Sequence, residues 1–479
     1  MKPIYLLTLL LISTANLSAA EKNTPNYYQD IRPIIEQNCL GCHSSKGISF
    51  SFEDPEQAYL YHAAINSAVQ QRRMPPWLAE IGHQIYKDDI SLSHRQLTQF
   101  EQWAEAGYPK GNKPAKTTGF KLEQDKITNS FNADLSLKSA QQAYLPKQNQ
   151  KDDYRCFIVD WPETKDKFVT GFKAIPGNTK VVHHIVLFAA RPEVTDMFKE
   201  LAAEEEGIGY QCFGGAVPDR LGDDETRRSF EKRYPGGVKK LSQNNYWLAH
   251  WAPGMDGYHF PKNTGVPIKK GSALILQVHY YSAFAPGEKD PGSQLSFTLA
   301  DSVKKPAIHY PLTNNGWLNS KNNQSMVINP GQQNTYAVNV SLKRIANYTA
   351  WITETQMESV NAVEIHSANV HMHAFGASGS TALVYENGET ETLLSIPRWD
   401  IDWQRDFTLA EPKRFDKNRF KQIQLSVDCT FKNYSDEIVY GGYGSDDEMC
   451  FNFSYIALEL KAKELTGEEL IKQVKSTAK

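Results

Sequence analysis

Two cysteines and a histidine fall within five consecutive residues near the start of the chain, Cys39-Leu40-Gly41-Cys42-His43. This CxxCH spacing is typical of haem c attachment, in which both thiols bond the vinyl carbons and the histidine ligates iron. A small disulfide or half a zinc site is the alternative, but no second CxxC or matching histidine pair lies nearby. The motif therefore predicts one covalently bound haem c at Cys39, Cys42 and His43.

A second axial ligand for that haem should come from the same part of the chain. Met74 is the only methionine between Cys42 and residue 112. Two prolines follow it, which exclude a regular helix and favour an extended loop that can present the thioether. We therefore predict Met74 as the ligand. Ordinary packing is the alternative for Met74, with His62, His83 or His94 as the other candidate ligands.

Two groups of histidines further along could bind metal ions. His183 and His184 are neighbours within the apolar run 181–188, and His279 lies in the apolar run 274–281. An imidazole in an apolar strand needs a partner, so these are either metal ligands or satisfied core residues. Because neighbours in a regular strand point to opposite faces, joint binding requires a distorted strand or the nearer ring nitrogens.

The second group is an HxH pair, His371 and His373, which alternation would place on one face of a strand. Met449 could add a thioether, and imidazoles combined with a thioether favour copper over zinc or magnesium. A structural role is the alternative for this pair too, and Met449 alone is more often a core residue than a ligand.

The segments that must position these residues fall into several parts. Residues 1–20 have a positive start, an apolar run and a small-residue end, which predicts a signal peptide and a secreted or periplasmic protein. Residues 21–112 carry apolar residues at helical spacing, and residues 113–130 read as a linker. Residues 131–303 and 304–462 favour two β-sandwiches, followed by a polar tail, 463–479.

The predicted fold is thus multidomain: a small all-α, cytochrome c-like domain followed by two all-β antiparallel, jelly-roll-like sandwiches. Gly, Pro and Asn punctuate the β-rich part, whose clearest apolar runs are 181–189, 273–281, 295–299, 337–342, 422–427 and 451–458.

Charge and the remaining cysteines narrow the class of protein. The formal net charge is -3, with acids and bases well mixed, so nucleic acid is not an expected partner. No stretch approaches the roughly 20 apolar residues of a membrane helix, so we expect no membrane span. In an exported chain, an even number of widely spaced cysteines predicts two disulfides among Cys156, Cys212, Cys429 and Cys450.

The order of these motifs resembles a known family. Segments 182–185, 276–280, 371–373 and 447–450 occur in the order found in the ascorbate-dependent type II copper monooxygenases, and the resemblance covers roughly residues 140–460. It implies two copper ions, O2, a small-molecule substrate and an external electron donor, either an ascorbate-like reductant or a redox protein. The implied reaction is hydroxylation of a C–H bond.

The resemblance also assigns the individual residues. It pairs Cys156 with Cys212 and Cys429 with Cys450. The implied ligands of the electron-transferring copper are His183, His184 and His279, and those of the copper that binds O2 are His371, His373 and Met449.

The chain departs from the family in two respects. Where the peptide-amidating branch holds a peptide carboxylate, this chain has Asn369, Phe451 and Phe453, which favour an apolar or neutral substrate. The haem motif is an addition, and it suggests an internal electron relay to the copper at His183, His184 and His279. The alternative function is a non-enzymatic periplasmic protein that transfers electrons through haem and copper or binds copper.

Overall fold

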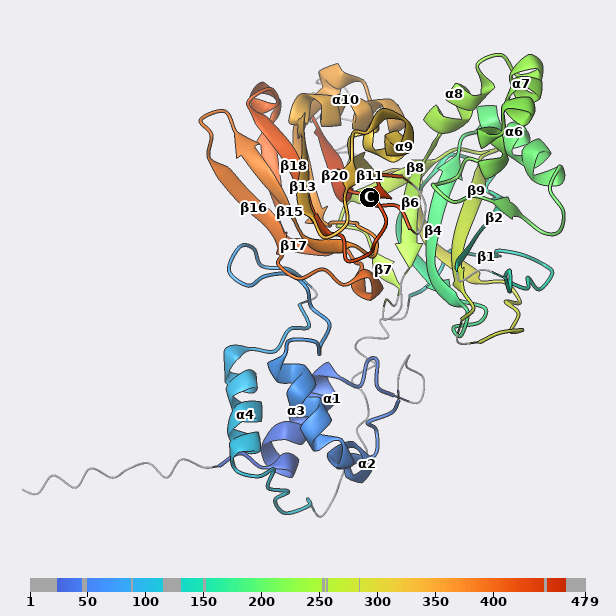
Figure 1. The fold of residues 1–479 in the computed structure, drawn as a ribbon. Helices are drawn as coiled ribbons and strands as arrows, with labels where there is room; N and C mark the ends of the chain where they lie inside the picture. The colour runs from blue at the N-terminus through green and yellow to red at the C-terminus, as the bar shows by residue number, and fades with distance from the viewer. Residues whose placement is uncertain are drawn as a thin grey trace, which may run out of the picture.

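The computed structural model describes residues 24–44, 50–87, 89–114, 131–149, 152–251, 255, 257–283, 285–442 and 446–461 (Figure 1). The expected signal peptide, most of the expected linker and the polar tail lie outside these residues. Within them, no helix is both long enough and apolar enough to cross a membrane.

The N-terminal part is helical, as its apolar spacing predicts. Its helices bury one shared apolar cluster, in which Tyr27, Phe100 and Trp103 are fully buried. The last of them begins with a capping box at Ser93, and Gly107 follows its end with a φ of +76°, a conformation that suits glycine. The helices are η1 (Tyr27–Ile31), α1 (Arg32–Asn38), α2 (Pro55–Leu60), α3 (His62–Gln70) and α4 (His94–Glu105).

The rest of the described chain is mostly β-sheet, arranged as two sandwiches that share one long sheet (Figure 1). A nine-stranded sheet runs through both halves in the order β1-β10-β3-β8-β11-β20-β14-β17, with β7 beside β3. The halves meet where β8 and β11 pair in parallel, Lys305 opposite Thr264. The strands of this sheet are β1 (Leu135–Lys138), β3 (Lys167–Ile175), β7 (Tyr258–His259), β8 (Thr264–Ile268), β10 (Gln294–Ala300), β11 (Lys305–Leu312), β14 (Val360–Ala368), β17 (Phe407–Asp416) and β20 (Asn452–Leu460).

Each half completes its sandwich with a second sheet. In the first half this sheet has the order β5-β2-β9-β4-β6 and in the second half β13-β18-β15-β16, and a short pair β12-β19 lies beside the latter. These strands are β2 (Asp152–Asp160), β4 (Val182–Ala190), β5 (Tyr210–Gln211), β6 (Asn245–Trp251), β9 (Ala273–Tyr281), β12 (Val327–Ile328), β13 (Gln333–Ser341), β15 (Gly376–Tyr385), β16 (Thr390–Ile396), β18 (Ile423–Lys432) and β19 (Val439–Tyr440).

Helices within the sandwiches are the main difference from the predicted all-β halves. Helices α6 (Pro192–Ala203), α7 (Asp224–Arg233) and α8 (Gly237–Gln243) form a second apolar cluster with Val186, Phe188 and Ile275. This is why β4 and β9 read as continuous apolar runs: both faces of their sheet are covered. Residue 342, expected to end a strand, instead begins α10 (Leu342–Ile352). Short elements complete the chain: η2 (Asp219–Gly222), η3 (Trp317–Asn319), α9 (Ser320–Asn323), η4 (Met357–Ser359), η5 (Ile401–Trp403) and η6 (Lys417–Arg419).

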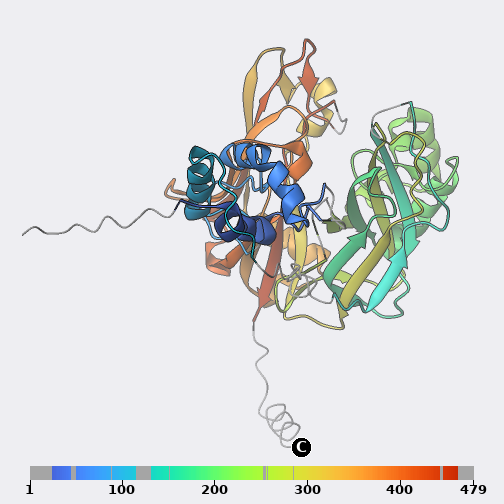
Figure 2. The same ribbon diagram turned by 90° about the horizontal axis from the view of Figure 1, so that it is seen from below.

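The helical N-terminal part lies against the second half, as both views show (Figures 1 and 2). Most of the described contact is made by residues 77–87, which we call the docking segment, and Arg398 also donates to the Arg72 carbonyl at 3.2 Å. Tyr86 is buried in the core of the sandwiches and forms a bridge with Leu409. The backbone N–H of Glu80 donates to the Ser395 carbonyl at 2.8 Å, and that of Lys87 to the Thr408 carbonyl at 2.9 Å. The segment is thus bound to β16 and β17.

Candidate metal sites

The first histidine group brings together three residues that lie far apart in sequence. The Nδ1 atom of His183 is 3.2 Å from Nδ1 of His184 and 3.2 Å from that of His279, and the third separation is 3.3 Å. Three nitrogens around one tetrahedral ion at about 2.0–2.1 Å would be about 3.3–3.4 Å apart. The three imidazoles therefore fit a metal ion, and they meet through their nearer nitrogens.

A strand distortion explains how two neighbours join one site. In the pairing of β4 with β9, Val182 lies opposite Tyr280, but His184, not His183, lies opposite His279. The extra residue is a bulge, which bends the strand and redirects a side chain. The sequence left open whether the adjacent residues His183 and His184 could belong to one site. The bulge allows it, because it turns both side chains toward His279.

The partners of His279 fix its tautomer. Its Nε2–H donates to the Asp152 carboxylate at 2.9 Å, which leaves the Nδ1 lone pair directed at the other imidazoles. Tyr154 stacks on its ring, with centroids 4.2 Å apart and planes within 5°. Burial lowers the pKa of His279, against the Asp152 hydrogen bond, and it holds the pKa of His184 well below its usual range. His184 and His279 are thus neutral near pH 7, as metal binding requires.

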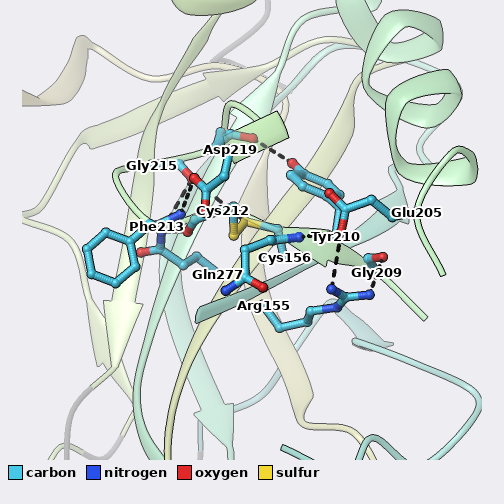
Figure 3. Close-up of a disulfide and its surroundings, with 12 residues drawn as sticks. Arg155, Cys156, Glu205, Gly209, Tyr210, Cys212, Phe213, Gly215, Asp219 and Gln277 are labelled. Carbon is cyan, nitrogen blue, oxygen red and sulfur yellow. Dashed lines mark hydrogen bonds and ion pairs between the residues drawn. A yellow bond between two sulfur atoms is a disulfide. The ribbon is translucent and has the colours of Figure 1, made fainter. Parts of the chain in front are cut away.

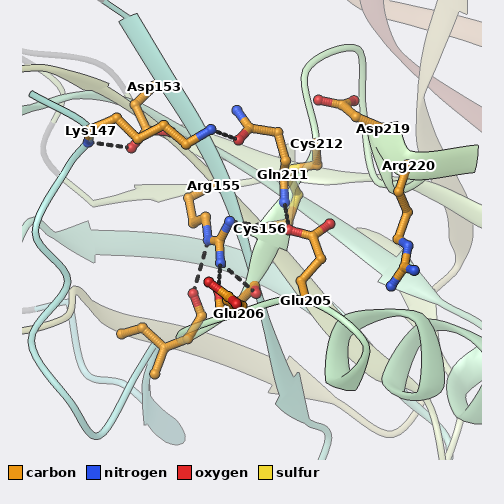
Figure 4. A network of polar contacts seen from close by, with 12 residues as sticks. Lys147, Asp153, Arg155, Cys156, Glu205, Glu206, Gln211, Cys212, Asp219 and Arg220 are labelled. Atoms are coloured by element: carbon orange, nitrogen blue, oxygen red, sulfur yellow. Dashed lines mark hydrogen bonds and ion pairs between the residues drawn. A yellow bond between two sulfur atoms is a disulfide. The ribbon is translucent and has the colours of Figure 1, made fainter. Parts of the chain in front are cut away.

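A disulfide and an arginine hold the loop behind Tyr154. Cys156 on β2 bonds Cys212, as expected, and Gln277 donates to the Cys212 carbonyl at 2.7 Å (Figure 3). The guanidinium of Arg155 donates to the carbonyls of residues 206, 208 and 209, each at 2.9 Å (Figure 4). These bonds fix the loop that carries Phe213, whose ring lies 4.6 Å from that of Tyr154. Phe213 follows Cys212 directly, so the disulfide helps to fix the ring that packs against Tyr154, and Tyr154 in turn stacks on His279.

The second histidine group presents the opposite ring nitrogens. Nδ1 of His371 bonds the side-chain oxygen of Gln404, and Nδ1 of His373 bonds the Asp447 carbonyl at 2.8 Å. With Nδ1 protonated in both rings, the Nε2 atoms keep their lone pairs for a metal ion. The rings lie 5.3 Å apart at 90°. Burial, followed by the nearby His373, lowers the pKa of His371 to about 3, so this ring is neutral as well.

Two sets of hydrogen bonds bring the segment of Met449 beside this pair. His371 and Phe451 form an isolated antiparallel bridge through hydrogen bonds of 2.8 and 3.1 Å. The Glu448 carboxylate accepts from the backbone N–H groups of both His373, at 2.9 Å, and Met449, at 3.2 Å. Met449 is buried, and the expected disulfide between Cys429 and Cys450 anchors the next residue.

The HxH pair does not lie in a strand, contrary to our expectation. His371 and His373 lie in the connection between β14 and β15, and Met449 precedes β20. In place of strand hydrogen bonds, the Glu448 carboxylate fixes this backbone by accepting from the N–H groups of His373 and Met449.

The two histidine groups come from different halves and influence each other's protonation. His371 contributes to the lowered pKa of His184, and His373 to that of His279, because like charges at close range disfavour protonation. Two candidate sites, one from each half, are therefore near enough to interact electrostatically.

The residues of the haem motif directly follow α1. Cys39 and Cys42 are free thiols in the described structure, and burial raises the pKa of both, that of Cys39 to about 12. Nδ1 of His43 bonds the Phe50 carbonyl at 3.0 Å, which leaves Nε2 available to iron. The motif offers the two thiols and the imidazole that haem c attachment uses, and the attachment itself stays a prediction.

The role of Met74 as the second axial ligand of the haem stays a prediction. Met74 lines a cavity of about 480 Å³ together with Trp77, Leu97 and Arg398, at the contact between the helical part and the second half. Among the alternatives, His62 bonds the Tyr59 carbonyl at 2.9 Å, and His83 pairs with Glu80 at 3.2 Å.

Sequence reasoning missed the residues that orient the candidate ligands. Asp152, Gln404 and Glu448 each hold a histidine or the backbone beside it. Of the three, only Glu448 could have been predicted from the sequence. It directly precedes the candidate ligand Met449 in an apolar context, where an acidic side chain needs a buried partner.

Comparison with known proteins identifies the family. Residues 138–284 match the N-terminal domain, and residues 319–466 the C-terminal domain, of the copper type II ascorbate-dependent monooxygenases. Together the two matches cover more than half of the chain, and this protein belongs to that family of copper enzymes. Its two disulfides indicate folding in an oxidising compartment.

Curated relatives agree with this assignment. Dopamine beta-hydroxylase of Rattus norvegicus is 23% identical over 63% of this chain and 42% of its own length. Tyramine beta-hydroxylase of Caenorhabditis briggsae is 21% identical over 65% of this chain and 46% of its own length. The chain thus spans less than half the length of these relatives. A solved structure of the infectious bursal disease virus VP2 subviral particle aligns with 70% of this chain and 74% of its own, at 9% identity. Its TM-score of 0.15 is too low to indicate a shared fold.

Proposed function

We propose that this protein hydroxylates a C–H bond of a small, largely apolar organic substrate with O2. The observation that carries the proposal is the second histidine group: two imidazoles whose Nδ1 atoms are hydrogen-bonded, and the thioether residue Met449, whose backbone N–H shares the Glu448 carboxylate with that of His373. Copper held by His371, His373 and Met449 would supply one-electron chemistry toward O2. The thioether favours the reduced ion, because soft ligands select Cu(I).

The first group suits a copper that only exchanges electrons. Its ligands would be three imidazoles, those of His183, His184 and His279, and the Asp152 hydrogen bond and the Tyr154 ring hold His279 in place. A rigid set of this kind limits rearrangement when the charge of the ion changes. The protein's role at this site is therefore to hold the ion and to fix the orientation of its imidazole ligands.

Aromatic side chains beside His371 support an apolar substrate. Phe451 and Phe453 are stacked with centroids 5.2 Å apart, and Trp247 from the other half stacks on Phe453 at 4.2 Å. Their rings lie 6.4 and 6.3 Å from that of His371 for Phe451 and Phe453. Such a wall binds a ring or alkyl group through apolar burial and positions its C–H bond beside the site.

A peptide carboxylate is a poor fit here. Asn369 stands where the peptide-amidating branch has an arginine, and its amide is already bonded to Asp406 and to the backbone of Phe453. It offers no free guanidinium that could pair with a carboxylate.

We also propose that the helical part is an electron-donating cytochrome c-like domain and that the protein works in the periplasm. Haem bound at Cys39 and Cys42 would supply single electrons. The contacts that support a relay lead to the second histidine group rather than to the His279 group we expected. Arg405 lies over the Trp77 ring at 5.1 Å and lowers the otherwise raised pKa of Cys42, and its neighbour Gln404 bonds His371.

Oxygen-isotope labelling tests the hydroxylation. Copper-loaded protein with ascorbate and ¹⁸O2 would be offered alkylbenzenes, phenylethylamines and N-acylglycines; the amines are included because the relatives are named for dopamine and tyramine. We expect products of the first two classes to gain one ¹⁸O atom and N-acylglycines none. Met449→Ala should abolish labelling, while Met197→Ala, which alters a buried methionine on α6, should not. Protein with two bound coppers that labels no substrate of any class would refute the proposal.

A further inference from the structure

A third cluster of metal-binding side chains lies at the junction of the two halves. His250 comes from β6, His309 from β11, and Asp406 directly precedes β17. One carboxylate oxygen, Oδ2 of Asp406, faces both imidazoles: it is 3.8 Å from Nε2 of His250 and 3.9 Å from Nδ1 of His309. The other oxygen accepts a hydrogen bond from the Asn369 amide at 2.5 Å, which fixes the carboxylate.

These side chains are buried without the hydrogen bonds that burial requires. His309 is 3% exposed, and neither of its ring nitrogens has a partner at hydrogen-bonding geometry among the described residues. The Phe453 backbone lies close enough to raise the pKa of His309, but burial outweighs it and lowers this pKa to about 4. Nδ1 of His250 is also unpartnered in the described structure. Leaving such groups unsatisfied costs about 1–3 kcal/mol each, so a bound group is expected.

The separations are too long for direct hydrogen bonds but near those across a metal ion. With bonds of about 2.0–2.2 Å, nitrogen and oxygen ligands of a tetrahedral ion lie roughly 3.3–3.6 Å apart. The observed 3.8 and 3.9 Å require each nitrogen–oxygen pair to close by only a few tenths of an ångström. The two rings, with centroids 6.1 Å apart at 77°, are more widely spaced than those of the His371 pair. Even at a wide nitrogen–metal–nitrogen angle the two nitrogens would lie no more than about 4.2 Å apart, so the imidazoles must move closer together when an ion binds.

We propose that His250, His309 and Asp406 form a third metal site, which binds a divalent transition-metal ion and ties the two sandwiches together. Two imidazoles and a carboxylate without a thioether suit Zn²⁺ or Cu²⁺ better than Cu(I). The side chains of His250 and Asp406 are 13% and 16% exposed, which gives the ion a way in. The site does not depend on the hydroxylation reaction, since none of the three residues is a proposed copper ligand.

Zinc binding to the full-length protein tests the site. Both copper sites are first filled with Cu(I) without oxygen, and the protein is then dialysed against Zn²⁺ and analysed for both metals. We expect one zinc per chain beside two coppers. His309→Phe should bind no zinc, because it replaces a ligand by an apolar ring of similar size and removes no hydrogen bond. His250→Gln should weaken binding at least tenfold, and His259→Phe, at an exposed histidine on β7, should not change it.

Two further readouts locate the ion and guard against misfolding. Zinc should raise the melting temperature of the wild type but not of His309→Phe, because an ion that binds only the folded state stabilises it. Anomalous diffraction at the zinc edge should show a peak among the three side chains. If His309→Phe does not fold, His250→Gln, at a less buried position, decides the matter. The proposal would be overturned if the wild type binds no zinc, if both variants bind zinc as the wild type does, or if the anomalous peak lies elsewhere. The cluster would then be a water-filled polar site.

Discussion

The Tyr86 ring is a buried part of the contact between the helical part and the second half. Tyr86 is 6% exposed, packs against Trp77 and Phe407 with centroids 5.9 and 5.5 Å away, and donates to the Leu393 carbonyl at 2.8 Å. Truncating a buried aromatic side chain to alanine costs about 3–5 kcal/mol. Since about 1.4 kcal/mol is a factor of ten, Tyr86→Ala should raise the undocked population roughly 10²- to 10⁴-fold. The helical part should stay folded, because Tyr86 is not in its apolar cluster, and the second half should stay folded, because it loses only one ring at the edge where the docking segment binds.

Hydrogen exchange followed by mass spectrometry measures this change directly. The N–H groups of Glu80 and Lys87 donate to residues 395 and 408 only while the docking segment is bound. Their exchange should accelerate by the same factor as the undocked population, when reclosing is fast. Tyr86→Phe is the matched control: it keeps the ring and loses one hydrogen bond, about 0.5–1.5 kcal/mol, so its exchange should rise no more than about tenfold.

Two results would refute this reasoning. Unchanged exchange at Glu80 and Lys87 in Tyr86→Ala would mean that the ring does not hold the segment. A parallel loss of protection in β18, far along the second half, would mean that docking and folding of that half are one cooperative event.

Four further predictions concern the haem, the copper, the relay and pH. Replacing Cys39 and Cys42 by serine should abolish haem that survives acid extraction, and a wild type matured with cytochrome assembly factors but lacking such haem would disprove the attachment. Met449→Ala should abolish turnover and keep the fold and one copper at His183, His184 and His279, as copper analysis and circular dichroism would show; full activity would reject Met449 as a ligand. In stopped-flow mixing with O2 and substrate, Gln404→Met should slow haem reoxidation at least tenfold if electrons enter at His371, whereas slowing only in His279→Ala would restore our first expectation. The hydrogen bond from Arg414 lowers the pKa of Glu459 to about 2, so this pair stabilises the fold above pH 4.5 and its contribution fades as pH falls toward 2. Arg414→Met should therefore lower the free energy of unfolding at pH 6, by about 1 kcal/mol or less because Arg414 is 39% exposed, and leave it nearly unchanged near pH 2, as thermal melts at the two pH values would show.

The sequence by itself determined which residues could do chemistry and most of the strands around them. The run 273–281 is β9, residue for residue, and 181–189 is β4 shifted by one. These local patterns survive because apolar runs and turn residues act over a few residues. Both disulfides pair as the resemblance implied, so the order of motifs along the chain carried real three-dimensional information.

The tertiary structure decided how those residues meet. The bulge in β4 arises from its pairing with β9, and the Glu448 carboxylate replaces a strand at the HxH pair, so neither could be read from spacing. Helices α6 to α8 were missed because a strand covered on both faces has the same apolar run as a buried core strand.

The junction cluster of His250, His309 and Asp406 escaped notice for a similar reason: each residue is unremarkable in its own segment. Their shared burial, and the lack of hydrogen bonds on His309, exist only once β6, β11 and β17 are brought together. Local sequence records the type of each side chain, whereas the free energy of burying it depends on neighbours supplied by distant parts of the chain.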